Sequence, residues 1–240
     1  MHTFTQLFLL MFVLSIGLRL WLSSRQIAHI RQHRGEVPDS FADKITLVEH
    51  QKAADYTTTK TRFGRLPLFY DAALLLIWTL GGGLEWLDQS IITMEFSPIM
   101  TGITVMLAFM LISSALNLPF SIYMTFVIEE KFGFNKTTVK TFIIDIFKGS
   151  ALGLAIGVPL LFAILWLMEQ MGELWWVYTW ILLSGFSILM MWIYPTWIAP
   201  IFNKFEPLEE GDTLNRIKGL LERCGFNSDG VFVIEGSKRS

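Results

Sequence analysis

The sequence predicts an all-α polytopic membrane protein with about five transmembrane helices, cytosolic helical extensions and the start of a small α/β soluble domain. Of its 240 residues, 52% are hydrophobic, including nine Trp and twenty Phe, and these residues are gathered in long blocks. The basic residues fall in alternate connections between the blocks, and residues 206–240 become polar. A net charge of −2 is too small to indicate a nucleic-acid partner.

Five apolar blocks are long enough to cross a bilayer, which requires roughly 20 apolar residues in a helix. Spans are expected at Phe4–Leu22, Leu66–Trp86, Ile99–Leu118, Ile146–Met168 and Trp175–Trp197. The first block lacks a basic start and a small-residue cleavage site, so we expect a retained span rather than a signal peptide. With the cytosolic segments 23–65 and 119–145, these spans predict a membrane domain over residues 1–205.

The basic residues predict the orientation of the spans. Apart from Arg19, they lie in three segments: Arg25, Arg31, Arg34, Lys44, Lys52, Lys60, Arg62 and Arg65; Lys131, Lys136, Lys140 and Lys148; and Lys204, Arg216, Lys218, Arg223, Lys238 and Arg239. The N-terminus and the loops 87–98 and 169–174 have no Lys or Arg. The positive-inside rule therefore predicts an outside N-terminus and cytosolic basic segments, in a bacterial inner membrane or the endoplasmic reticulum membrane.

Acidic residues near the spans have two interpretations. Asp71 and Glu85 lie near the ends of the second span. Ionisable groups within a membrane are functional candidates, but at these depths solvation at the interface is the preferred interpretation.

The segment 23–65 is expected to form two short amphipathic helices broken at Gly35 and Pro38. His29 and His33 stand four residues apart, as two zinc ligands on a helix would. No Glu follows the first His and no third ligand is nearby, so a polar surface is preferred over a metal site.

Residues 117–135 predict a helix that leaves the third span and ends at Gly133. Asn135 or Thr137 is then expected to cap the next helix, which gives a helical hairpin. Its tip comprises Glu129, Glu130, Lys131, Phe132, Gly133, Phe134 and Asn135. The charges are either simply solvated or part of a clasp against a soluble domain, and we interpret both carboxylates as structural.

After the fifth span, Pro195, Pro200 and Pro207 are expected to terminate helical structure. Asp212 is expected to cap a helix that closes at Gly225, and Val231–Ile234 predicts a strand. One helix and one strand cannot bury a core. Residues 206–240 are therefore expected only to begin a soluble domain, truncated at Ser240.

Three stretches resemble one known family. Phe126-Val-Ile-Glu-Glu-Lys-Phe-Gly-Phe-Asn135, Ile198-Ala-Pro-Ile-Phe-Asn-Lys-Phe-Glu-Pro-Leu208 and Glu235-Gly-Ser-Lys-Arg-Ser240 are similar to segments of CAAX prenyl protease 1 proteins, the integral-membrane zinc peptidases of the M48 group. The resemblance implies a chambered helical shell that cleaves prenylated or membrane proteins. In that family, a His-Glu-x-x-His motif and a distant Glu supply the zinc ligands and the base.

The chain departs from this pattern because none of its four histidines lies in a His-Glu-x-x-His motif. We therefore expect no catalytic or metal-binding residue and no zinc in this chain, and inactivity without a missing C-terminal metallopeptidase part. The resemblance also implies a substrate-groove or structural role for Val231, Phe232, Val233, Ile234, Glu235, Lys238 and Arg239. The expected partners are the lipid bilayer, that missing part and a peptide or prenylated substrate.

Two alternatives remain open on the sequence. One is a non-enzymatic scaffold or degenerate homologue that forms a lipid- or peptide-binding chamber. The other is a transporter, which is weaker because the spans show no inverted repeat.

Overall fold

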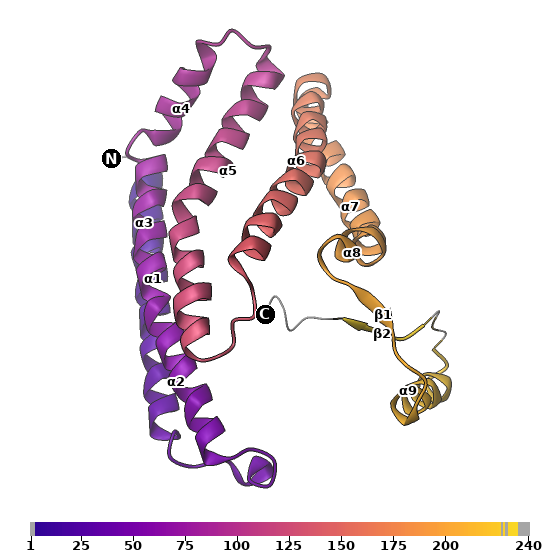
Figure 1. Ribbon diagram of the computed structural model, residues 1–240. Coiled ribbons are helices and arrows are strands. Elements are labelled where there is room, and N and C mark those ends of the chain that lie inside the picture. Colours follow the sequence, from indigo (N-terminus) through magenta and orange to yellow (C-terminus); the bar gives the residue numbers. More distant parts are fainter. Residues whose placement is uncertain (1–2, 227, 229, 235–240) are drawn as a thin grey trace. The chain divides into compact units, whose positions relative to one another are not determined.

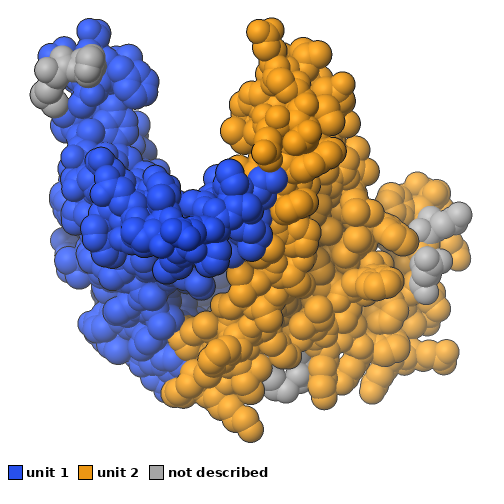
Figure 2. All heavy atoms as spheres, turned by 90° about the horizontal axis from the view of Figure 1, so that it is seen from above, with its two compact units in different colours: residues 1–135 blue, residues 136–240 orange. Residues whose placement is uncertain are grey.

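The computed structural model describes residues 3–226, 228 and 230–234. Its residues divide into two compact units, 1–135 and 136–240, coloured separately in Figure 2. This division falls within the predicted membrane domain, and the predicted boundary at residue 205 stays a prediction.

The first unit is a set of long helices (Figure 1). It contains α1 (Thr3–Gln32), α2 (Leu47–Phe63), α3 (Arg65–Thr79), α4 (Gly83–Ile92) and α5 (Pro98–Tyr123). Asp39–Phe41 forms a short 3-10 helix, and Met124–Glu129 continues α5 as a π-helical segment. The helix following the third span is thus confirmed, with wider turns at its end.

Segment 23–65 differs from the expectation of two short amphipathic helices. α1 continues without a break from the first apolar block to Gln32, so the first of the two is the end of a long helix. Ile27 lies on this extension and is buried, which shows that the extension has a packed face. The second helix is α2, and a capping box between Thr46 and Glu49 fixes its start.

The predicted second span, 66–86, is broken. α3 ends at Thr79, and α4 continues after a bend of 53°. Gly82 adopts φ +77°, and a Cβ at Gly81 would lie 2.8 Å from the Ile77 carbonyl oxygen. The bend therefore requires glycine, because both the left-handed backbone and the close approach exclude larger residues. Apolar composition alone does not reveal this break.

The second unit contains α6 (Val139–Gln170), α7 (Trp175–Ile193), α8 (Ala199–Phe202) and α9 (Asp212–Arg223). A 3-10 turn, Gly172–Leu174, joins α6 to α7, and a π-helical segment, Tyr194–Ile198, joins α7 to α8. β1 (Phe205–Pro207) pairs antiparallel with β2 (Phe232–Ile234). β2 confirms the predicted strand, whereas β1 was not predicted.

Three predicted helix ends in this unit are wrong. The chain remains helical through Pro195 and Pro200 as far as Phe202. The π-helical turn tolerates the loss of the backbone N–H donor that proline lacks. Thr138, rather than Asn135 or Thr137, caps α6 through its side-chain oxygen, which accepts from the Thr141 amide.

Of the two predicted ends of α9, the start is wrong and the end is confirmed. Asp212 lies inside the first turn and pairs with Arg216 at 2.9 Å, so Gly211 takes the capping position. The predicted closure at Gly225 is confirmed, since this residue has φ +66° and its amide donates to the Glu222 carbonyl.

Four helices, or five when the bent α2–α3 and α4 pair counts as one span, are long and apolar enough to cross a membrane. Many of their largest side chains are exposed, among them Trp180 at 67% and Met191 at 79%. Exposure of this extent on apolar helices is expected where lipid replaces water as the solvent.

Candidate functional site

The predicted hairpin tip packs against α2. The edge of the Tyr56 ring contacts Phe132 and Phe134, with centroid distances of 5.5 and 4.7 Å. Ile128 and Phe132 are 4% and 9% exposed, so the contact has a buried centre. The Tyr56–Phe132–Phe134 group, called the aromatic cluster below, thus joins two segments that are more than 70 residues apart in the sequence.

The turn at the tip depends on Gly133, which has φ +71°. The amide of Phe134 donates to the Glu129 carbonyl and the amide of Gly133 to the Glu130 carbonyl, as in a helix-closing motif. The Asn135 side-chain amide donates to the Glu130 carboxylate at 3.0 Å. The Glu130 carboxylate therefore accepts a local hydrogen bond within the tip, and the structural role of Glu129 and Glu130 stays a prediction.

An ion pair between Arg34 and Asp55 lies beside the aromatic cluster. Arg34 Nε and Nη2 donate to Oδ1 and Oδ2 of Asp55 at 2.8 and 2.7 Å. The hydrogen bond from Arg34 lowers the pKa of Asp55, and the positive charges of Arg34 and Lys131 lower it further. The carboxylate remains ionised at neutral pH and holds Arg34 in a fixed geometry.

The rings of His33 and His50 each contact a backbone carbonyl oxygen. The rings of His29 and His33 lie 4.3 Å apart, but His33 Nδ1 is 2.9 Å from the His29 carbonyl oxygen. His50 Nε2 lies 2.9 Å from the His33 carbonyl oxygen. Within residues 3–226, 228 and 230–234, no three His, Cys, Asp or Glu side chains are placed to hold a metal ion.

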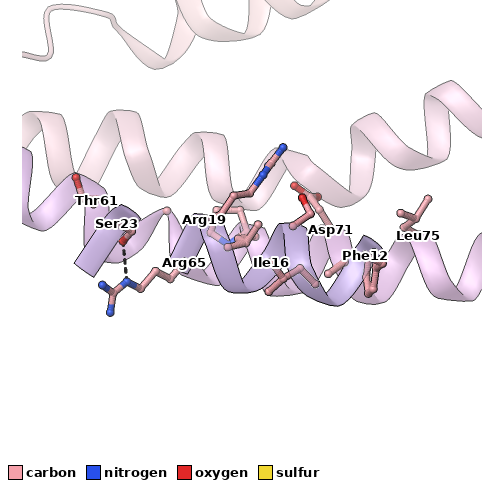
Figure 3. Close-up of a pocket in the computed structure, with 13 residues that line it drawn as sticks. Phe12, Ile16, Arg19, Ser23, Thr61, Arg65, Asp71 and Leu75 are labelled. Atoms are coloured by element: carbon pink, nitrogen blue, oxygen red, sulfur yellow. Dashed lines mark hydrogen bonds between the residues drawn. The ribbon is translucent and has the colours of Figure 1, made fainter. Parts of the chain in front are cut away.

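A pocket of about 520 Å³ with a mainly apolar lining lies between α1 and α3 (Figure 3). Arg19 and Asp71 extend into it from the two helices, among apolar residues such as Phe12 and Leu75. The structure places no ion pair within 4.0 Å between these two described side chains. Arg65 also lines the pocket, and its guanidinium donates to Ser23 Oγ and Ser24 Oγ at 2.9 Å each.

The remaining predicted residues lie in the second unit. Val231 accepts a hydrogen bond from the Leu208 amide, and Phe232 and Val233 are exposed strand residues of β2. Ile234 pairs with Phe205 at the end of the two-stranded sheet. Glu235, Lys238 and Arg239 lie outside the described residues.

Sequence reasoning missed the Arg34–Asp55 ion pair and the shared pocket of Arg19 and Asp71. Arg19 was a basic residue within the first predicted span, and Asp71 was an acid within the next. Charges of opposite sign in consecutive antiparallel spans are a usable signal for such a pocket. For Arg34 and Asp55, no sequence pattern reveals the pairing, because the turn between α1 and α2 sets their register.

Comparison with known proteins identifies this architecture. A family model described as the CAAX prenyl protease N-terminal region, with five membrane helices, matches residues 26–204. The chain belongs to this family. The membrane-protease resemblance of the sequence is thereby confirmed, and the protein is a multi-pass integral membrane protein.

Relatives of this CAAX prenyl protease chain are longer than the chain itself. The CAAX prenyl protease 1 of Saccharomyces cerevisiae is 34% identical over 234 residues, which cover 92% of this chain and 50% of that protein. The Caenorhabditis elegans homologue is 30% identical, covering 93% of this chain and 50% of that protein. The chain spans about half the length of these curated relatives.

A solved structure has the same fold. The crystal structure of S. mikatae Ste24p superposes with a TM-score of 0.86 at 32% identity, covering 95% of this chain and 54% of that one. The chain therefore corresponds to the N-terminal portion of a CAAX prenyl protease.

Proposed function

We propose that this chain forms the membrane wall of a zinc metalloendopeptidase that cleaves prenylated or membrane proteins. The observation that carries the proposal is the family match over residues 26–204, which covers most of the helical structure. The named relatives are CAAX prenyl proteases, about half of whose length this chain spans. In this proposal the chain binds and encloses substrate, while a further part of the protein performs the chemistry.

The described residues do not fit a catalytic zinc ion. A catalytic zinc needs three protein ligands around an open position, whereas His33 and His50 each contact a backbone carbonyl oxygen and no described group of three ligating side chains converges. We therefore assign the zinc ligands and the base to a His-Glu-x-x-His part outside this chain. The exposed β1–β2 ribbon offers Phe232 and Val233 as a wall for the substrate groove.

Zinc content tests this division of roles. We expect purified chain to contain no stoichiometric zinc by plasma mass spectrometry. Co-expression with the C-terminal half of a CAAX prenyl protease 1 homologue should give a complex with about one zinc per complex. Stoichiometric zinc in the chain alone, lost on His29→Ala and His33→Ala replacement, would contradict the assignment.

We also propose that the basic segments face the cytosol and that the N-terminus faces outward. Cys224 is the single cysteine of the sequence. In a Cys224→Ser background, a single cysteine is introduced in place of Lys44, Lys136 or Glu173. Each variant reports the side of the membrane on which one connection lies: 23–65, 119–145 or 169–174. With the protein expressed in a bacterial inner membrane, we expect a membrane-impermeant maleimide added to intact cells to label only position 173, because basic loops remain inside.

Permeabilised cells provide the control for that experiment, since all three positions should then react. Labelling of positions 44 and 136 in intact cells would reverse the proposed orientation. Both outcomes are independent of the zinc measurement.

A further inference from the structure

A basic pocket of about 460 Å³ lies where α1, α2 and the segment after the π-helical turn meet. Its cationic side chains are Arg31, Arg34, Arg62 and Lys131, and its carboxylate is Asp55. Thr58, which is 9% exposed, lines it as well. The lining set thus carries three net positive charges in a concave site.

The ion pairing leaves most of this charge available. Arg34 donates to both oxygens of Asp55, so this one pair offsets the single negative charge of the pocket. The ion pairs of the described residues do not include Arg31, Arg62 or Lys131. Basic residues that only obey the positive-inside rule have no need to share a cavity, so their convergence points to an anionic ligand.

The height of the pocket above the bilayer limits the ligand. α1 is continuous from its apolar block, which ends at Leu22, to Gln32. At about 1.5 Å per residue, Arg31 lies roughly 14 Å beyond Leu22. Arg62 lies about 5 Å from the level of Arg65, which bonds Ser23.

The headgroup region of one leaflet is only about 5–8 Å thick beyond the hydrocarbon. If the hydrocarbon ends at Leu22 and α1 runs along the bilayer normal, Arg62 lies at the level of lipid phosphodiesters and Arg31 lies above them. A ligand that reaches both must carry phosphate at the membrane surface and further phosphate farther out.

We propose that this pocket binds the phosphomonoester groups of an anionic lipid whose headgroup extends beyond its phosphodiester. Arg62 contacts phosphate near the bilayer, Arg31 and Lys131 hold the outer phosphate groups, and the Arg34–Asp55 pair keeps α1 against α2. This inference rests on the geometry of the first unit and does not depend on the peptidase assignment.

Titration of the full chain with a fluorescent short-chain phosphatidylinositol bisphosphate, followed by anisotropy, tests the proposal. The pocket variant combines Arg31→Gln, Arg62→Gln and Lys131→Gln and leaves the Arg34–Asp55 pair intact. The matched control combines Lys44→Gln, Lys136→Gln and Lys140→Gln, which removes equal charge from exposed positions outside the pocket. Circular dichroism and thermal melting establish that both variants fold.

We expect the pocket variant to bind roughly 100-fold more weakly, because each basic residue near an anionic surface contributes a factor of about five. The control should lose less than about threefold, and short-chain phosphatidylserine at equal total charge should compete poorly. Equal losses of affinity in both variants, or equal affinity for the two lipids, would show that binding depends only on general surface charge. Either result would overturn the proposal.

Soluble inositol trisphosphate separates the two sources of phosphate. If the lipid is the ligand, the soluble headgroup competes at least tenfold more weakly, since it lacks the contribution of the anchored chains. Competition by the soluble headgroup at the same concentration as the lipid would assign the site to a soluble phosphorylated molecule and overturn the lipid assignment.

Discussion

Replacing Phe132 with Ala is expected to loosen the first unit by about 3 kcal/mol, the low end of the usual cost of emptying a buried Phe site. Phe132 is 9% exposed and contacts Tyr56 edge to face at 5.5 Å. The replacement removes both the buried apolar area of the Phe132 ring and its aromatic pair with Tyr56. Hydrogen exchange of the α2 amides should accelerate roughly 100-fold, because local opening exposes them.

Phe41→Ala is the matched control, because Phe41 lies in the segment that leads into α2 but is 50% exposed. We expect its effect on α2 exchange to be less than about threefold. Unchanged α2 protection in the Phe132 variant would show that the hairpin tip does not hold α2, and the structural role of residues 129–135 would then be wrong.

Replacing Asp71 with Leu is expected to destabilise the α1–α3 pair by about 2 kcal/mol, because Arg19 would keep its charge without a nearby carboxylate. Arg19 is three residues inside the end of the first apolar block, and Asp71 is six residues beyond Arg65, which bonds Ser23. The two therefore lie at similar depth and line one pocket. Arg19→Leu should cost a similar amount.

The double replacement distinguishes coupling from two independent effects. We expect Arg19→Leu with Asp71→Leu to recover most of the lost melting temperature in lipid nanodiscs, because no uncompensated charge remains. Asp88→Leu, on an exposed position of α4, should change melting only slightly. Additive losses in the double variant would contradict electrostatic coupling across the pocket.

The sequence predicted most of the fold because apolar length and charge placement are local signals. The spans corresponding to α1, α5, α6 and α7 follow from uninterrupted hydrophobic blocks. The tip at Gly133 and the end at Gly225 follow from the left-handed conformations that glycine adopts. The helices continue through Pro195 and Pro200 because the π-helical turn accommodates them, which the proline rule does not anticipate.

The candidate sites were less predictable because they depend on register between helices. Tyr56 contacts Phe132 and Phe134 only because α2 packs beside the end of the α5 extension. Likewise, the basic pocket is lined by Arg31 of α1, Arg62 of α2 and Lys131 after the α5 extension. Composition showed that these segments are basic and amphipathic, but not which charges share a cavity.

Cleavage of a farnesylated CAAX peptide is the measurement that tests the central claim most directly. The assay compares the purified chain, the C-terminal half of a CAAX prenyl protease 1 homologue, and the co-expressed complex of the two. We expect release of the three terminal residues only from the complex, with activity abolished by a zinc chelator and restored by zinc. Zinc-dependent cleavage by the chain alone would contradict the claim that it forms the membrane wall of an enzyme whose chemistry lies elsewhere.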